Sequence, residues 1–306
     1  MSGIILLVGP PGSGKSTWAH DQINNGGDLG AMCVRVNGDD QGKTGHMDVF
    51  LRALHEGKDI IVDRMGFNKQ QRSKYLDMAK NKGYETKIIV FHESFQTCLD
   101  RATKRVGHPT IQDAETAKKA ITFFFKNYER VEDSEADEVV RRWPEGKKPK
   151  AVVCDLDGTL CDISHRRHFV QRDGRKNWKA FFEGIPNDKS NKWCACILRA
   201  MSNYEFKVVY CSGRGEEYRN TTENWLKENS LDQFCVDGAP WSDYKADLYM
   251  RLAGDSRKDS IIKNIILDFE LKTRYNIYFA IDDRRQVVDM WRKNGIVCLA
   301  CAEGDF

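Results

Sequence analysis

The length and composition of this chain predict a globular protein of about two domains. It has 306 residues, and an average domain has about 150. With 41% hydrophobic and 30% charged residues, the composition is typical of neither disordered nor membrane proteins. The longest early apolar run, Ile4 to Val8, has five residues. A membrane helix needs roughly 20 and a signal-peptide core about 7–15, so we expect neither.

Charge and cysteine content do not by themselves identify a partner or a metal. The chain carries 48 basic and 45 acidic residues, with 24 against 21 up to Lys150 and 24 of each after it. A nucleic-acid-binding domain is recognised by a stronger basic excess, so any polyanion site has to be local. Cys298 and Cys301 have C-x-x-C spacing, but Cys194 and Cys196 do not supply the second pair that a zinc site needs. We therefore expect structural thiols in a reducing compartment.

Strands and helices alternate through the first part of the chain. Apolar, β-branched runs predict strands at Ile4–Val8, Met32–Val36, Ile60–Asp63 and Lys87–Phe91. Helical periodicity predicts helices at Lys69–Lys82, Phe95–Arg105 and Gln112–Val131. This alternation indicates a parallel sheet with helices on both faces.

A linker is predicted at residues 141–150, which contain two prolines, one glycine and five basic residues. After it the alternation resumes, with strands at Ala151–Cys154, Lys207–Tyr210, Ile277–Ile281 and Ile296–Leu299. No sequence repeat relates the two parts. We predict two doubly wound α/β domains, at residues 1–140 and 151–306.

The first predicted strand leads into the sequence GPPGSGKS at residues 9–16. This sequence fits G-x-x-x-x-G-K-[S/T] between a strand and a helix. Its glycines let backbone N–H groups point at phosphate oxygens, and the helix N-terminus adds partial positive charge. Lys15 can then reach the β- and γ-phosphates of a nucleoside triphosphate, and the Ser16 hydroxyl can bind magnesium. The sequence therefore predicts a nucleotide site.

Acids and arginines after this loop indicate phosphoryl transfer. Asp39 follows the second strand and is a candidate base for an acceptor hydroxyl, although Asp39 or Asp40 could instead cap a helix. Asp63 ends the third strand and is either a magnesium-site acid or an acceptor-orienting one. Arg101 and Arg105 lie four apart on one helix face and suit the charge of a moving phosphoryl group, or are simply solvated. Further candidate contacts to an acceptor phosphate are Lys43, Arg64 and Arg72.

The second domain opens with a strand that runs into Asp-Leu-Asp-Gly-Thr at residues 155–159. This motif resembles that of the haloacid dehalogenase phosphatase superfamily. The resemblance implies that Asp155 attacks phosphorus, and that Asp157 protonates the leaving alcohol and later activates water. Two anions beside a phosphate require magnesium and nearby cations. The residues that match the superfamily's remaining site positions, mostly at strand ends, are Ser212, Gly213, Arg214, Asp259, Lys263, Asp282 and Asp283.

The two motifs in this order are similar to the bacteriophage polynucleotide 5′-kinase/3′-phosphatase family. The resemblance is strongest at residues 148–160 (KPKAVVCDLDGTL) and from Ala280 to Phe306. It implies transfer of the ATP γ-phosphate to 5′-hydroxyl ends of RNA or DNA, and hydrolysis of 3′-phosphate and 2′,3′-cyclic phosphate ends. It further implies ATP and Mg²⁺ as cofactors, a link to a polynucleotide ligase, a homo-oligomer, and a cytoplasmic location, in the host if a phage encodes the chain.

The same resemblance implies individual roles. In the kinase, Asp39 is the base, Asp63 and Arg64 contact the acceptor, Lys15 and Arg105 are catalytic, and the ATP site comprises Gly12, Gly14, Lys15, Ser16, Thr17, Arg101 and Arg105. In the phosphatase, Lys263 steadies the nucleophile Asp155, with Asp157 as acid and base. Phosphate contacts are Arg166, Ser212, Gly213, Arg214 and Asp259. Besides Ser16 in the kinase, the metal ligands are Asp155, Asp157, Asp282 and Asp283.

The chain departs from the family on the acceptor side of the kinase. Asp39 and Asp63 are only 24 positions apart, and Gly38 and Gly42 stand where the best-known member has arginines. Lys43 or Arg64 would then substitute. Two alternatives remain: the same two activities directed at a small metabolite or mononucleotide, and a nucleic-acid-binding adaptor with degenerate domains. The retained lysine and aspartates argue against the adaptor.

Overall fold

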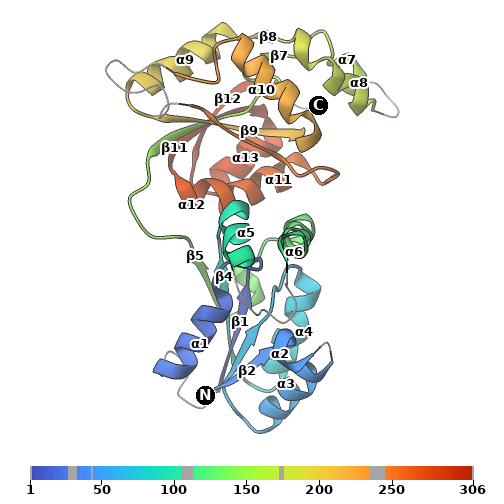
Figure 1. Cartoon of the computed structure of the whole chain (residues 1–306), viewed down its shortest axis with the longest axis vertical. Helices are drawn as coiled ribbons and strands as arrows, with labels where there is room; N and C mark the ends of the chain where they lie inside the picture. The colour runs from blue at the N-terminus through green and yellow to red at the C-terminus, as the bar shows by residue number, and fades with distance from the viewer. Residues whose placement is uncertain are drawn as a thin grey trace. The chain divides into compact units, whose positions relative to one another are not determined.

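The computed structural model describes residues 2–26, 33–42, 44–104, 113–171, 176–234 and 245–304 of the chain. It divides into two compact units, unit 1 at Met1–Glu145 and unit 2 at Gly146–Phe306. Each unit contains one five-stranded sheet (Figure 1). No helix in the described ranges is long and apolar enough to cross a membrane.

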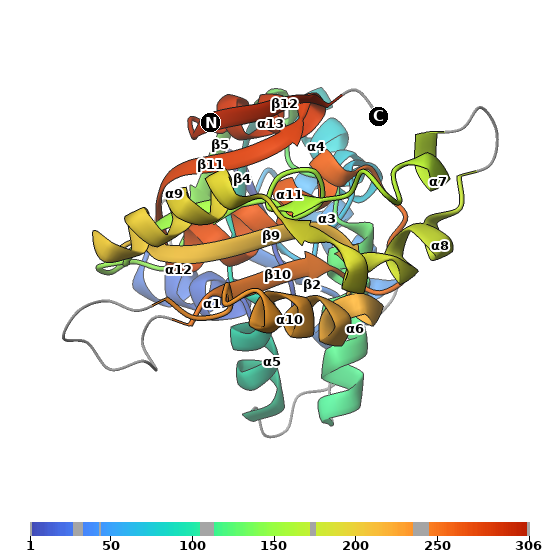
Figure 2. The same ribbon diagram turned by 90° about the horizontal axis from the view of Figure 1, so that it is seen from above.

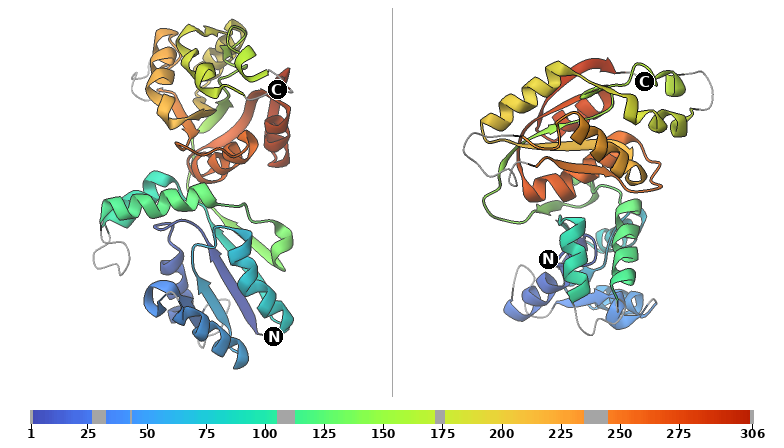
Figure 3. Two further views of the ribbon diagram at one scale, coloured as in Figure 1. Left: turned by 90° about the vertical axis from the view of Figure 1, so that its right-hand side faces the viewer. Right: turned by 45° about the horizontal axis from the view of Figure 1, so that its top comes forward.

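Unit 1 is a parallel sheet in the order β2-β3-β1-β4-β5. Its strands are β1 (Gly3–Val8), β2 (Val34–Asn37), β3 (Ile60–Asp63), β4 (Glu85–Phe91) and β5 (Glu138–Arg142). Its helices are α1 (Lys15–Asn25), α2 (Gly38–Gln41), α3 (Gly45–His55), α4 (Lys69–Asn81), α5 (Phe95–Lys104) and α6 (Ala114–Asn127). Helix α1 covers one face of the sheet through Ala19, and α3 and α4 cover the other (Figures 1 and 3).

Strand β5 was not expected from the sequence, and it shortens the predicted linker. Arg141 and Arg142 pair with Val90 and Phe91 of β4, so only residues 143–149 lie between the two sheets. The strand has the sequence Glu-Val-Val-Arg-Arg. Its two arginines continue into the basic segment that follows. It forms because β4 offers an otherwise unpaired edge.

Unit 2 is also parallel, in the order β10-β9-β6-β11-β12. Its strands are β6 (Lys150–Cys154), β9 (Lys207–Gly215), β10 (Asp247–Arg251), β11 (Asn276–Arg284) and β12 (Val297–Gly304), with the small pair β7 (Cys161–Asp162) and β8 (Lys189–Ser190). Its helices are α7 (His168–Gln171), α8 (Trp178–Glu183), α9 (Lys192–Asn203), α10 (Arg219–Glu228), α11 (Asp259–Ile266), α12 (Lys272–Arg274) and α13 (Arg285–Lys293).

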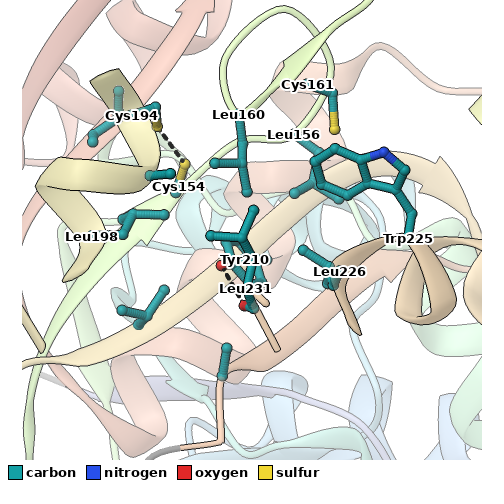
Figure 4. Close-up of a cluster of buried hydrophobic side chains, with 14 of the residues drawn as sticks. Cys154, Leu156, Leu160, Cys161, Cys194, Leu198, Tyr210, Trp225, Leu226 and Leu231 are labelled. Carbon is teal, nitrogen blue, oxygen red and sulfur yellow. Dashed lines mark hydrogen bonds between the residues drawn. The ribbon is translucent and has the colours of Figure 1, made fainter. Parts of the chain in front are cut away.

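Two apolar clusters hold the helices of unit 2 on the sheet. Alternate strand residues face opposite sides: Val152 and Tyr210 pack with α9 and α10, whereas Val153 packs with α11 and α13. Figure 2 shows this sheet between its two helical layers. In the first cluster the Tyr210 hydroxyl donates to the Leu231 carbonyl at 2.7 Å (Figure 4), so a buried polar group is satisfied.

The first strand of each unit lies in the middle of its sheet, and the later strands are added on both sides of it. In such sheets the loops diverge at the carboxyl end of the central strand and leave room for a ligand there. The P-loop follows β1 and the Asp-x-Asp motif follows β6. The fold therefore places both motifs where ligands collect.

Candidate active sites

The P-loop in unit 1 wraps around the side chain of its own lysine. Lys15 is buried, and its ammonium donates to the Pro10 carbonyl at 2.8 Å and to Ser13 Oγ at 3.3 Å. Helix α1 begins at Lys15 without a side-chain cap, which leaves its first N–H groups available to an anion. Ser16 is half-buried and Thr17 exposed at this end.

Gly12 and Gly14 shape the P-loop in different ways. Both have left-handed backbone, with φ of +83° and +96°. A Cβ on Gly12 would lie 2.3 Å from the Cys98 carbonyl oxygen of α5, whereas a Cβ on Gly14 would meet nothing within 4 Å. Only at Gly12 does packing against a neighbouring helix add to the conformational demand.

The acids predicted for the kinase meet at the ends of β2 and β3. Asn37 and Asp63 are register partners, and Asn37 caps α2 by accepting a hydrogen bond from the Asp39 N–H at 2.6 Å. Neither Asp39 nor Asp40 is therefore the cap. Asp39 is exposed in the first turn of α2, at the same edge of the sheet as the P-loop. This is where a base for an acceptor hydroxyl is needed.

Arg35, which the sequence did not single out, pairs with two acids at this edge of the sheet. Its guanidinium bonds Asp63 Oδ2 at 2.6 and 3.0 Å and Asp40 Oδ2 at 2.8 Å. Asp63 Oδ2 is thus already neutralised, which favours an orienting role over direct magnesium binding. Arg35 occupies an unremarkable position within β2, and its partners come from another strand and a later turn. No signal in the sequence pairs them.

The basic residues predicted for the kinase form three groups: Arg101 and Arg64, the two residues outside the described ranges, and Arg72. Arg101 on α5 is about half-exposed and bonds Glu93 at 2.9 Å. Arg64 lies beneath the turn that carries Asp39: a Cβ on Gly38 would lie 2.6 Å from its Nη1, a buried nitrogen without a partner in the described part of the chain. Arg105 and Lys43 lie outside the described residues, as does Met32 at the start of one predicted strand.

Arg72 is the third case, and its interpretation as an acceptor contact is wrong. Its side chain is fully buried and bonds both carboxylate oxygens of Glu135, at 2.6 and 2.8 Å. It also donates to the Gly66 and Glu129 carbonyls. The guanidinium is therefore used to join α4 to the segment before β5. The sequence pattern could not distinguish such a buried arginine from a ligand-binding one.

Unit 2 gathers its predicted catalytic residues around one buried lysine. The Lys263 ammonium lies 2.6 Å from Asp155 Oδ1, 2.8 Å from Asp282 Oδ2 and 3.6 Å from Asp259 Oδ2. Although burial opposes its charge, these carboxylates hold the pKa of Lys263 well above its ordinary value. Burial, together with Asp282 and Asp283, raises the pKa of Asp155 well above its ordinary value despite the lysine. Asp155 therefore depends on nearby positive charge to stay ionised.

Asp283 has a carboxylate oxygen that makes no hydrogen bond within the described ranges. Asp155, Asp282 and Asp283 each offer an oxygen within 4.8 Å of the others. Asp282 Oδ2 is taken by Lys263 and Trp291, whereas Asp283 Oδ2 is buried with no partner among the described residues. Burial and the adjacent Asp282 raise the pKa of Asp283 to about 6. A buried, unpartnered carboxylate oxygen beside two further acids fits a hard divalent cation.

Asp157 does not point into this group but into a cluster with two arginines. Arg214 bonds its carboxylate at 2.7 and 3.0 Å, and Arg166 also donates to it. Although burial opposes its charge, these arginines hold the pKa of Asp157 well below its ordinary range. Its carboxylate therefore lies outside the metal-type group, contrary to its expected place among the ligands.

Asp188 completes this cluster and was not anticipated. Its buried carboxylate accepts hydrogen bonds from Arg166, from Arg214 at 3.2 Å and from His165 at 2.9 Å. Two carboxylates thus balance the charges of the two arginines. In the sequence Asp188 follows Pro186 and Asn187 and reads as an ordinary loop acid.

The remaining predicted phosphate contacts line the same edge of the sheet. The Ser212 hydroxyl accepts from the Arg214 N–H at 3.2 Å. A Cβ on Gly213 would lie 2.2 Å from Asp259 Oδ1, so glycine is needed for α11 to approach. A cavity of about 520 Å³ opens here, lined by Asp155, Asp157, Gly213 and Asp259 together with apolar and basic side chains.

The described cysteines are free thiols, and two of them contact site residues: Cys161 accepts from Arg214 at 3.4 Å and Cys301 lies 3.5 Å from Thr159 Oγ1. Cys298 and Cys301 lie three residues apart on β12 and face opposite sides of the sheet, Cys298 in the core beneath α13 and Cys301 beside Thr159. Both are free thiols. Among the described residues, Asp155, Asp282 and Asp283 form the one cluster with metal-ligand geometry.

Comparison with known proteins matches a family to part of each unit. Residues 149–306 match the family described as the polynucleotide kinase PNKP phosphatase domain. The chain belongs to this family. Residues 4–131 match the AAA domain family, which agrees with the P-loop in unit 1. The two matches leave residues 132–148 uncovered, a stretch that includes β5.

Individual relatives are more distant. A protein of Autographa californica nuclear polyhedrosis virus, named for a bifunctional polynucleotide kinase/RNA ligase, is 26% identical over 94% of this chain. The Arabidopsis thaliana protein named transcription factor bHLH140 is 31% identical over 34% of the chain. The chain spans 41% of the first relative and 12% of the second. A chain of the solved Pnkp1/Rnl/Hen1 complex aligns over all of this chain and 98% of its own length, at 26% identity and a TM-score of 0.41.

Proposed function

We propose that this chain is a bifunctional end-healing enzyme, which phosphorylates 5′-hydroxyl ends of RNA or DNA and removes 3′-phosphate or 2′,3′-cyclic phosphate ends. One observation carries the proposal: the whole of unit 2 matches a polynucleotide phosphatase family, with Lys263 placed on the nucleophile Asp155. The P-loop of unit 1, with its lysine inside the loop, supports the second activity.

In the kinase, backbone N–H groups and Lys15 bind the β- and γ-phosphates of ATP. Asp39 accepts the proton of the 5′-hydroxyl as its oxygen attacks the γ-phosphorus, and ADP leaves. Arg101 turns from Glu93 to the phosphates, which its exposure permits. Asp63 acts through Arg35, which holds the strand end before Asp39. Magnesium beside Ser16 would neutralise phosphate charge.

In the phosphatase, a carboxylate oxygen of Asp155 attacks the phosphorus, and the 3′-oxygen leaves with a proton from Asp157. Water then cleaves the aspartyl phosphate, with Asp157 taking its proton. Asp157 has to be protonated first, and Arg166 and Arg214 oppose this in the free enzyme. Substrate phosphate oxygens need the same guanidinium donors, so substrate binding would draw them from Asp157 and raise its pKa.

A divalent cation would be held by Asp155 and Asp283, with Asp282 beside them. The unpartnered Asp283 oxygen is the observation in favour of this site. Such a cation supplies positive charge to the nucleophile and the phosphate oxygens. The carboxylate of Asp157 is left to proton transfer.

The test is one oligonucleotide that carries a 5′-hydroxyl and a 3′-phosphate, incubated with ATP and Mg²⁺ while both ends are analysed. The expected product has a 5′-phosphate and a 3′-hydroxyl, which is the pair that a ligase joins. Asp39→Ala should abolish only the first change and Asp155→Ala only the second, with Asp77→Ala on the exposed face of α4 as the control. Two unchanged ends with wild-type protein, or loss of both activities in either folded variant, would contradict the proposal.

A further inference from the structure

The cavity beside Asp155 has two chemically different walls beyond its reacting end. One wall is apolar and comes from α7, α8 and Ile163; the other follows β10 and carries basic residues. Figure 2 shows α7 and α8 beside each other at one end of the sheet. At about 520 Å³ the cavity lies within the range of roughly 300–1,000 Å³ that holds small-molecule ligands, so it extends past a bare phosphate group.

The apolar wall is a set of stacked aromatic rings. Trp178 lies nearly parallel to Phe182, with ring centroids 5.9 Å apart and planes at 24°. Phe182 packs in turn against Tyr218 at 4.8 Å, and Phe181 meets Trp178 edge-on at 5.8 Å. This packing fixes the orientation of the indole, yet Trp178 remains 43% exposed. An exposed indole held by other rings offers a rigid flat surface to a ligand.

This aromatic set is joined to the catalytic charges. The Arg166 guanidinium carbon lies 4.2 Å from the centroid of the Phe181 ring, and Arg166 also donates to Asp157. Contacts therefore run from the acid, through one arginine, to the rings of α8. A substrate whose phosphate sits at Asp155 would have the group next to its phosphate facing this wall.

Beyond Asp155 and Asp157 the lining carries the acids Glu217, Asp255 and Asp259 as well as basic residues, and two exposed lysines among these can face phosphodiesters. Arg251 and Arg257 are bound to backbone carbonyls and to Asp255, but Lys258 is exposed on the loop that lines the cavity. On the aromatic side, the Lys176 ammonium lies 5.6 Å from the Trp178 centroid. Cations interleaved with aromatic surface are the combination that binds single-stranded nucleic acid.

We propose that Trp178 is a stacking subsite for the unpaired base of the nucleotide that carries the 3′-phosphate. The inference rests on the proposed function and adds how the phosphatase recognises an end. Since stacking uses a base face without hydrogen bonds to its edge, the subsite accepts any base but requires one. A terminal base in a duplex is held by pairing and by stacking on its inner neighbour, which must be broken before it can turn to Trp178, so an unpaired 3′ end is the preferred substrate.

The test combines a protein variant with a substrate variant. Trp178→Ala should raise KM for a single-stranded oligonucleotide 3′-phosphate by about 5- to 150-fold, which corresponds to the ~1–3 kcal/mol of one base stack. Wild-type protein should lose the same factor when the terminal nucleotide is abasic. Trp178→Ala assayed with the abasic substrate should show no further increase in KM, because the two changes remove the same contact. Trp178→Phe should retain most of the affinity.

Trp193→Ala is the matched control, since this tryptophan is 45% exposed on α9 and does not line the cavity. It should leave KM unchanged. An unchanged KM in Trp178→Ala, or equal losses with base-bearing and abasic substrates, would overturn the subsite while leaving the phosphatase intact. If wild-type protein instead hydrolyses glycerol 2-phosphate but no oligonucleotide, the proposed function fails and the subsite with it.

Discussion

Replacement of Lys263 by methionine tests the charge balance of unit 2 most directly. Lys263→Met keeps the length of the side chain and removes its ammonium. That ammonium is fully buried and lies 2.6 Å from Asp155 and 2.8 Å from Asp282. Removing one partner of a buried ion pair leaves the other charge uncompensated and costs about 3–5 kcal/mol. For a unit of this size each kcal/mol lowers Tm by ~2–4 °C, so we expect a decrease of about 6–20 °C.

The pH dependence of this loss has a defined sign. Asp283 has its pKa raised to about 6, and the pKa of Asp155 is raised as well. A carboxyl whose pKa is raised in the folded state destabilises the fold as the pH rises through that value. At pH 5 protonation therefore removes part of the uncompensated charge, and the deficit of Lys263→Met should be smaller than at pH 8.

The assay is scanning calorimetry of unit 2 in the full chain at pH 5 and pH 8, with 5′-kinase activity as a check that unit 1 is folded. Lys179→Met is the control, because Lys179 is 83% exposed and lies 3.8 Å from Glu183; it should change stability by less than about 0.5 kcal/mol. Adding Asp282→Asn to Lys263→Met should restore part of the loss. Wild-type Tm in Lys263→Met at pH 8, or a deficit that grows at pH 5, would refute the reasoning.

Three further substitutions test other parts of the two sites. In Gly158→Ala the new Cβ would lie 2.2 Å from Asp283 Oδ2, so Mg²⁺ affinity measured by calorimetric titration should fall by about tenfold or more; wild-type affinity would contradict the cation site. Asp188→Asn removes one of the two negative charges that balance Arg166 and Arg214. The kcat/KM of the phosphatase should therefore fall about 10- to 100-fold with a changed pH profile, and Asp188→Glu should restore part of the activity. An unaltered pH profile would mean that Asp188 has a merely structural role. Arg72→Met breaks the pair with Glu135 and should cost unit 1 about 3–5 kcal/mol in urea unfolding, with kcat for 5′-phosphorylation by the folded protein unchanged; a large loss of kcat would return Arg72 to the acceptor site.

The sequence was informative wherever the chemistry depends on residues that are close in the chain. The P-loop, with Lys15 five residues after the carbonyl that it contacts, is a local structure, and so is the Asp155–Asp157 motif. The strand that precedes each motif is a short apolar run whose partners need not be known. Local patterns therefore sufficed to predict two α/β units, the central strand of each and the two reactive loops.

The sequence was not informative about which charged groups pair with one another. Arg72 and Arg166 are both arginines, and each is flanked by polar residues in the sequence. Arg72 is bound to a carboxylate 63 positions away, whereas Arg166 joins Asp157 to the unanticipated Asp188. Strand β5 likewise depends on the edge of β4, which the sequence does not identify. These pairings arise from contacts between distant segments.

Asp282 and Asp283 show the division most clearly. The sequence by itself determined that two acids end a strand of unit 2, but only the family resemblance, which implies Asp283 as the chief distal metal ligand, distinguished them. Both acids lie in one cluster, but Lys263 comes from the separate helix α11, so only the tertiary structure brings its ammonium to Asp282 and leaves one oxygen of Asp283 unpartnered in the described part of the chain. Residue type can be read from sequence, but the charge that each side chain faces depends on how strands and helices pack.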